Sequence, residues 1–448
     1  MSTPPRRPRR LPLTGSPSTR LPLTRFPLTR FPLTRFPLTR FPLLAAATTL
    51  CALGLPLVPA STAAADDGGQ CNYPNKKYEG RPWSLQRVQL DELWAQSTGK
   101  NVRVAVIDTG VDVRNPQLAK AVDAKSGINL IPKDAKDANG YKLKRGKENG
   151  TTDTVGHGTK VAGIIAARPA KGTGFVGLAP DATIIPIQQN DADGNGTTTT
   201  LAAAIRHAIA KKADVINISQ DTADAVKPTP LLEEAVKAAL EAEIVVVASA
   251  GNDGLGGNVK RTYPASYEGV LAVAASDRNN ERAAFSQSGD FVGVAAPGVD
   301  MVSTVPLGGH CADNGTSFSA PYVAGLAALI KSKHDDWTQE QIVAQIQQTA
   351  ERSVAGHDRL VGWGVVDPVR ALTEDDKPIE KPVAREGVTR AEAPTPAAVH
   401  LGETPEQRAT RLATYVVVSG GVLVAVITGS AVAVRDHRRR RATAASGR

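Results

Sequence analysis

The chain has 448 residues, with 53 Lys and Arg against 44 Asp and Glu, so its formal net charge is +9. The excess lies at the two ends: residues 1–65 hold nine Arg and no other charged residue, and residues 435–448 hold six Arg and one Asp. Residues 66–434 carry −5, which excludes a basic nucleic-acid-binding domain. A hydrophobic content of 41% excludes a largely disordered chain.

The first 65 residues have the three parts of a secretory signal. An Arg-rich region precedes an apolar run at residues 43–58, and small residues at 63–65 form a cleavage site. Ahead of the apolar run, LPLTR is followed by FPLTR three times, and the recurring Pro and Arg exclude a helix or a membrane span there. We interpret residues 1–65 as a signal peptide with a low-complexity leader; the alternative is a start site assigned too far upstream.

Residues 66–95 form an N-terminal extension, and residues 96–373 are long enough for one large domain. The extension is too short for a usual inhibitory prodomain, and we interpret it as a segment that wraps the domain. Of the three cysteines, Cys51 lies in the signal, which leaves Cys71 and Cys311. In an oxidising compartment an even number favours a disulfide between them; two free thiols are the alternative.

The large domain alternates apolar strands with helices. We expect strands at residues 102–107, 182–187, 215–218, 244–248 and 269–274, and helices at residues 158–167, 198–211, 231–242, 319–331 and 338–350. Continuous apolar strands between helices predict an α/β fold whose mostly parallel sheet has helices on both faces. The active site of such a sheet lies at the carboxyl ends of its strands.

Three reactive residues stand where such a sheet places its chemistry. Asp108 closes the first strand in VAVIDTGVD, His157 opens a helix in GHGTKVAGIIAA, and Ser317 stands at a helix start in NGTSFSAPYVAG. A hydroxyl nucleophile needs a positioned His as its base, and an Asp holds that His in the correct tautomer. We therefore predict that Asp108, His157 and Ser317 form a catalytic triad.

A fourth residue follows another buried strand. Asn252 follows the apolar run at residues 245–250, with only Gly251 between them. At a strand end its side-chain N–H can donate to a developing oxyanion, beside the backbone N–H of Ser317. The alternative is an ordinary Gly-Asn turn.

The C-terminal part predicts a membrane anchor. Residues 374–411 are rich in Pro, Ala, Glu and Thr and form an expected linker. Residues 415–434 follow without a charged side chain, and at about 1.5 Å per residue they span roughly 30 Å, one bilayer core. Because Arg residues follow at once, we expect residues 435–448 to be a basic cytoplasmic tail and the large domain to be extracytoplasmic. A repeat of small residues in this span is ordinary composition or a contact face for another helix; it consists of Gly421, Ala425, Gly429 and Ala433.

Four short motifs carry a family resemblance. DTG, HGT, SAGN and GTSFSAPYVAG resemble the signatures of subtilisin-like serine proteases, over about residues 102–372. The resemblance implies a subtilisin-like α/β fold, serine endopeptidase activity and no cofactor. The catalytic residues it implies are Asp108, His157 and Ser317, with Asn252 as the oxyanion donor.

The same resemblance implies substrate-binding residues. Asn217, Ile218 and Ser219 match the strand that binds the substrate backbone. Thr262 precedes residues 263–265, a segment that resembles the edge of the primary specificity pocket, where the proline is usually cis.

Longer stretches are similar to the mycosins, which are membrane-anchored subtilases associated with type VII secretion in actinobacteria. These stretches are YEGRPWSLQRVQLDELWAQSTGKNVRVAVIDTGV and HDRLVGWGVVDPVRAL, together with the Pro-rich linker, the single span and the Arg tail. The similarity implies a few exported proteins as substrates. It also implies the secretion machinery as a partner, contacted through the transmembrane helix.

Two departures from the family pattern bear on activity and metal binding. The usual Leu-Gly-Gly is replaced by Gln220, Asp221 and Thr222, whose side chains narrow the expected substrate cleft. This narrowing favours, as an alternative function, a scaffold with weak proteolysis. Gln117 replaces an Asp that many subtilisins use to bind calcium, so we predict no metal at that site.

Two other metal-like patterns have ordinary interpretations. Residues 191–196 match half of an EF-hand loop, but Ala202 stands where the bidentate Glu belongs, and we expect a polar turn. His310 and Cys311 alone are too few for a metal site. His207 is expected on a helix face without a functional role.

Overall fold

The computed structural model describes residues 71–136, 142, 145–191, 196–219, 228–255, 261–385 and 405–445. The signal peptide, residues 220–222, most of the run 191–196 and residues 386–404 of the linker lie outside the described residues. The chain divides into two units, residues 1–68 and 69–448, and every described residue belongs to the second.

A seven-stranded sheet forms the centre of the large domain, in the order β2-β3-β1-β4-β5-β6-β7. All six pairings within it are parallel. The central strands are almost entirely buried, as their continuous apolar sequences predict. The strands are β1 (Arg103–Asp108), β2 (Ile128–Asn129), β3 (Thr183–Gln188), β4 (Val215–Ile218), β5 (Val245–Ser249), β6 (Leu271–Ser276) and β7 (Val292–Pro297). An antiparallel hairpin follows, β8 (Met301–Thr304) and β9 (His310–Asp313).

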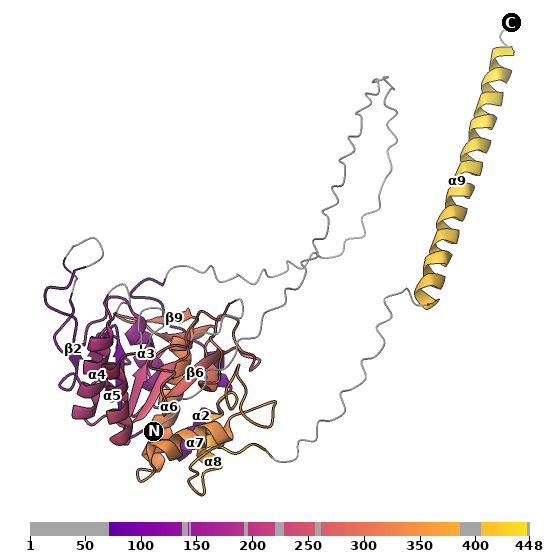
Figure 1. Ribbon diagram of the computed structural model, residues 1–448. Coiled ribbons are helices and arrows are strands. Elements are labelled where there is room, and N and C mark those ends of the chain that lie inside the picture. Colours follow the sequence, from indigo (N-terminus) through magenta and orange to yellow (C-terminus); the bar gives the residue numbers. More distant parts are fainter. Residues whose placement is uncertain are drawn as a thin grey trace, which may run out of the picture. The chain divides into compact units, whose positions relative to one another are not determined.

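Helices cover both faces of this sheet (Figure 1). Alternate residues of each strand enter opposite cores: Val104 and Val106 pack in one cluster, Ala105 and Ile107 in the other. The first cluster includes α3 (His157–Ala166), α6 (Thr316–Lys333) and α7 (Gln339–Thr349). The second includes α4 (Thr198–Ala210) and α5 (Pro230–Glu241). The predicted fold class, subtilisin-like α/β with helices on both faces, is confirmed.

All ten predicted elements are present within three residues of their expected bounds. Four short or edge strands, β2 and β7–β9, were not predicted from the sequence. Nor were three short helices, α1 (Trp83–Gln86), α2 (Leu90–Gln96) and α8 (Pro368–Thr373). These segments are too short for a hydrophobic period to emerge, or are dominated by Gly and Ala, as in the β7 sequence VGVAAP.

The described N-terminal extension packs along the domain. The indole of Trp83 donates to the Val299 carbonyl at 2.9 Å, and the hydroxyl of Tyr322 donates to the Ser84 carbonyl at 3.1 Å. Leu90 is almost fully buried in the larger core cluster. The extension is therefore part of the folded domain.

The extension is also joined covalently to the hairpin. Cys71 and Cys311 form a disulfide that links positions 240 residues apart, with a Cα–Cα distance of 6.1 Å. The predicted disulfide is confirmed.

The C-terminal elements differ from their expected bounds. Residues 374–385, expected to begin the linker, pack on the domain: the Val383 amide donates to Gln348 Oε1 at 2.7 Å, and the Arg385 amide donates to the Ala355 carbonyl at 2.8 Å. The apolar helix α9 runs over Pro405–Ala445, so it starts ten residues before the expected span and continues into the expected tail. Its apolar part has a mean hydropathy of 2.2, which suits a membrane span by length and composition.

Candidate active site

The side chains of Asp108 and His157 meet at the carboxyl end of β1. Asp108 Oδ1 lies 2.8 Å from His157 Nδ1 and also accepts from the Thr109 amide at 2.7 Å. The Asp108 residue is 1% exposed, and its second carboxylate oxygen is buried without a hydrogen bond. Because a carboxylate accepts, Nδ1 of His157 carries the proton and Nε2 keeps its lone pair. Nε2 is therefore able to act as a base.

Glycines on both sides of His157 allow this approach. Gly156 has φ 91°, a conformation that other residues rarely adopt. A Cβ on Gly158 would lie 2.2 Å from the Gly110 carbonyl oxygen, so the helix start would have to move away from β1. The spacing Gly-His-Gly is thus required by the packing of α3 on the end of β1.

The charges around His157 set its proton affinity. Burial lowers the pKa of His157, whereas the charge and the hydrogen bond of Asp108 raise it. Lys160 lowers the pKa further and Asp153 raises it, and the balance leaves the pKa above its ordinary value of 6.5.

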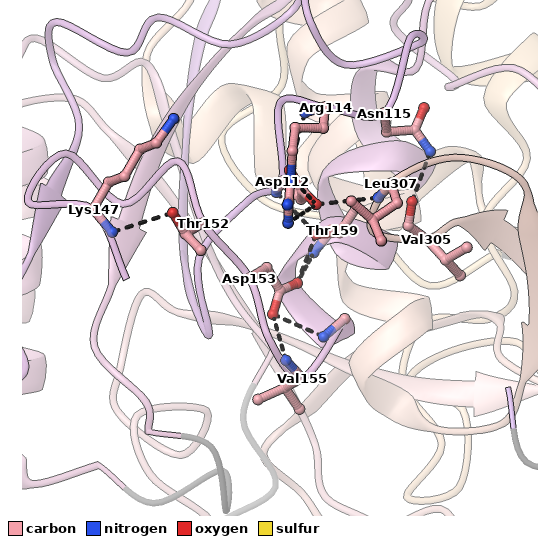
Figure 2. Close-up of polar contacts among 11 residues, drawn as sticks. Asp112, Arg114, Asn115, Lys147, Thr152, Asp153, Val155, Thr159, Val305 and Leu307 are labelled. Atoms are coloured by element: carbon pink, nitrogen blue, oxygen red, sulfur yellow. Dashed lines mark hydrogen bonds and ion pairs between the residues drawn. The ribbon is translucent and has the colours of Figure 1, made fainter. Parts of the chain in front are cut away.

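Asp153 holds the loop before His157, and the sequence analysis missed it. Its carboxylate accepts from the amides of Val155 at 3.0 Å, Gly156 at 2.7 Å and Thr159 at 2.9 Å. It also accepts from the hydroxyls of Thr109 and Thr159, and Figure 2 shows it turned toward Val155 and Thr159. Five donors and no acceptor define an ionised carboxylate, although burial raises the pKa of Asp153.

Ser317 is the second residue of α6 and is 5% exposed. Within the described residues its hydroxyl makes no hydrogen bond. The ring of the next residue, Phe318, contacts the ring of His157, with centroids 5.3 Å apart. The structure therefore brings the start of α6 against the imidazole, which is the arrangement that a His base for Ser317 requires.

Asn252 lies beside the same helix start. Its Oδ1 accepts from the Thr316 amide at 2.9 Å and from the Thr316 hydroxyl at 3.1 Å. This anchors the acceptor end of the amide and turns Nδ2 toward Gly315. A Cβ built on Gly315 would lie 3.6 Å from Asn252 Nδ2 and 3.7 Å from Ser317 N. Two N–H donors thus border one space that glycine leaves open, a geometry suited to an oxyanion.

The expected substrate-binding residues occupy two strand ends. Asn217 and Ile218 are 0% and 1% exposed within β4, and Asn217 Nδ2 donates to Ser219 Oγ at 2.8 Å. Ser219 is also only 1% exposed, so all three expected residues are buried in this structure. The Thr262 hydroxyl donates to the Ala250 carbonyl at 2.8 Å, and the following Tyr263–Pro264 bond is cis, as expected.

The donor set around Gln117 does not fit a cation. Gln117 Nε2 donates to the carbonyls of Arg168 at 2.8 Å and Phe175 at 3.0 Å. Its Oε1 lies 2.7 Å from His310 Nε2, and His310 Nδ1 accepts from the Tyr78 amide. An amide NH₂ group thus points at the carbonyls that a metal would need. Burial lowers the pKa of His310 to about 4, so this histidine is neutral.

The remaining metal-like patterns find other partners. Cys311 is in the disulfide, and His207 Nε2 contacts the Ser126 carbonyl at 2.8 Å on a face of α4. Across the ranges that the structure describes, three or more His, Cys, Asp or Glu side chains do not gather in a metal-binding group.

A parallel α/β sheet with a paired Asp and His at one strand end and a Ser at a helix start defines a serine endopeptidase. The chain belongs to the subtilase family, whose sequence model matches residues 99–364. Subtilisin E of Bacillus subtilis (strain 168) is 37% identical over 290 residues, which are 64% of this chain and 70% of the relative.

The structural neighbours of this chain include mycosin proteases of type VII secretion systems. MycP1 with its N-terminal propeptide removed is 34% identical with a TM-score of 0.56, over 65% of this chain and 97% of that one. MycP3, described as a protease from the type VII (ESX-3) secretion system, is 33% identical with a TM-score of 0.56, over 67% of this chain and 90% of that one.

Proposed function

We propose that the chain is a membrane-anchored, extracytoplasmic serine endopeptidase that processes a few exported proteins during type VII secretion. The observation that carries the catalytic part is the contact series from Asp108 through His157 to Phe318, next to Ser317. Its likeness to MycP1 and MycP3 supports the secretion role. The apolar helix α9, followed by Arg residues, supports the anchor and its orientation.

In this mechanism Ser317 Oγ attacks the scissile carbonyl carbon while His157 Nε2 takes the hydroxyl proton. Asp108 stabilises the imidazolium that forms. The carbonyl oxygen becomes an oxyanion, which accepts hydrogen bonds from Asn252 Nδ2 and the Ser317 amide. His157 then protonates the leaving amine, and a water molecule hydrolyses the acyl-enzyme by the same steps.

Replacing the nucleophile tests the activity. Ser317→Ala should lower kcat by about 10⁴- to 10⁶-fold because the covalent step is lost, while the folded domain keeps its unfolding transition. The measurement is cleavage of a library of peptides, together with labelling of the wild-type serine by a fluorophosphonate. Undiminished peptide cleavage by Ser317→Ala would refute the assignment.

A scaffold is the second candidate function, favoured by the residues Gln220, Asp221 and Thr222 in place of a small, open segment. Exported proteins would be compared by mass spectrometry among wild-type, Ser317→Ala and deletion strains. Loss of processing in both mutant strains supports the protease. Normal secretion in Ser317→Ala with loss on deletion favours the scaffold.

A further inference from the structure

A buried lysine lies next to the candidate base and has no part in the proposed mechanism. Lys160 is three residues after His157 on α3 and is 7% exposed. Lysine is among the residues least often buried, and burying its charge without a partner is costly. Its Nζ donates to Asp313 Oδ2 at 2.7 Å, so the ammonium is paired.

The partner of this lysine lies close to the nucleophile in the chain. Asp313 is the last residue of β9, four positions before Ser317. Its second oxygen accepts from the Asn314 amide at 2.9 Å, and Asn314 Oδ1 accepts from the Asp300 amide at 2.7 Å. One carboxylate therefore holds both the lysine and the turn that leads into α6.

The same lysine also borders the contact between His157 and Phe318, the residue after Ser317. Its Nζ lies 5.9 Å from the centroid of the Phe318 ring, and that ring contacts the ring of His157. The Ser303 hydroxyl, on β8 of the same hairpin, donates to the Lys160 carbonyl at 2.6 Å. Both the backbone and the ammonium of Lys160 are thus held, and the side chain links α3, which carries His157, to the turn that precedes Ser317.

We propose that the Lys160–Asp313 ion pair is a positioning device that sets the placement of His157 relative to Ser317. The ion pair links α3 to the turn before α6 through a single charged hydrogen bond. The proposal rests on the proposed triad. A displacement of about 1 Å between a base and its nucleophile is enough to lower a rate about 100-fold. Lys160 is a positioning residue here, because its own contacts are with Asp313 and Phe318.

The charge of this pair gives the proposal a second readout. Three charged groups shift the pKa of His157: Asp108 from β1, Asp153 from the loop before α3, and Lys160. Burial raises the pKa of Tyr73 in the extension, and the charges of Asp153 and Asp313 raise it further. Removing the Lys160 ammonium leaves the imidazolium better stabilised, so the base becomes protonated at a higher pH.

Three variants separate these effects. Lys160→Met should lower kcat about 10- to 100-fold with little change in KM, and should move the acid limb of kcat/KM to higher pH. Lys160→Arg keeps the charge and should restore the wild-type acid limb and part of kcat. Asp313→Asn removes the ion pair between α3 and the turn before α6 but keeps the lysine charge. We therefore expect kcat to fall while the acid limb of kcat/KM does not move to higher pH.

The matched control is an ion pair at the other end of α6. Lys333 Nζ lies 2.7 Å from Asp375 Oδ2, away from the start of the helix. Lys333→Met should lose stability in urea as a broken ion pair does, yet keep kcat and the acid limb. If Lys160→Met behaves like this control, or loses activity only in proportion to its loss of folded protein, the positioning proposal is overturned.

The readouts also distinguish this proposal from the assignment of the triad. Fluorophosphonate labelling of Ser317 in the wild-type protein tests the triad alone. If the wild type is not labelled, the triad assignment fails and the positioning proposal fails with it. If the wild type is labelled, an unchanged rate and pH profile in both Lys160→Met and Asp313→Asn refutes the positioning proposal alone.

Discussion

The starts of α3 and α6 are built alike but leave their backbone N–H groups in different states. Each follows a glycine with positive φ, Gly156 in one case and Gly315 in the other. At α3 the protein uses the first-turn amides itself: Gly158 N donates to the Thr109 hydroxyl, and Thr159 N donates to Asp153. At α6, the Ser317 amide makes no hydrogen bond among the described residues.

The difference shows how one structural element serves two purposes. The first amides of a helix lack partners within the helix and attract negative charge. When a carboxylate from the same chain accepts from these amides, as Asp153 does, the helix start is held in place and so is the backbone of His157. When one amide is left open beside Asn252, the helix start is available to an anion that forms only during the reaction.

Among changes at the two helix starts that leave Ser317 in place, removing the side-chain donor beside α6 should have the largest effect on activity. Asn252→Asp keeps the Oδ1 acceptor for the Thr316 amide but replaces the Nδ2 donor with an oxygen. We expect kcat to fall about 10²- to 10³-fold with KM little changed, because the donor acts on the oxyanion and not on the bound peptide. Steady-state kinetics measures both constants. A rise in KM alone would place Asn252 in substrate binding.

Neutralising the carboxylate on the closed side should act mainly on stability. In Asp153→Asn an amide NH₂ faces donors such as Thr159 N, so at least one buried donor loses its acceptor. The expected loss is about 1.5–3 kcal/mol in the free energy of unfolding, measured in urea. A fully stable Asp153→Asn protein would contradict the role given to Asp153.

The smallest expected effect is a displaced pH profile. The proposed mechanism requires neutral His157, and the balance of its neighbours raises the pKa of this residue above 6.5. The acid limb of kcat/KM should therefore lie above pH 6.5 and fall about tenfold per pH unit below it. Asp153→Asn removes a charge that raises this pKa, so its limb should move to lower pH. A wild-type limb below pH 6.5 would contradict this electrostatic account.

Much of the fold and of the candidate site could be predicted from local sequence. The five strands β1 and β3–β6 are continuous apolar runs, so their order along the chain could be predicted. His157 and Ser317 are marked by nearby glycines. The short hairpin β8–β9 was missed because it carries no such pattern.

Contacts between distant residues could not be predicted in the same way. Lys160 and Asp313 are 153 positions apart, and neither stands in a motif that names the other. Gln117 was recognised as a departure from the calcium pattern, yet only the fold brings the carbonyls of Arg168 and Phe175 to its amide. Such pairs depend on how helices and loops pack, which residue spacing does not encode.

The disulfide between Cys71 and Cys311 also imposes an order in time. Cys71 is synthesised 240 residues before its partner, which at 5–20 residues per second is a wait of about 12–48 s. Until the disulfide forms, Tyr73 is joined covalently to the rest of the domain only through the backbone. The hydroxyl of Tyr73 donates to the Val155 carbonyl, two residues before His157. Ser317 follows Cys311 by six residues, so the proposed nucleophile and the partner thiol of the extension are synthesised almost together. The disulfide that holds the extension can therefore form only once the chain has been made nearly as far as Ser317.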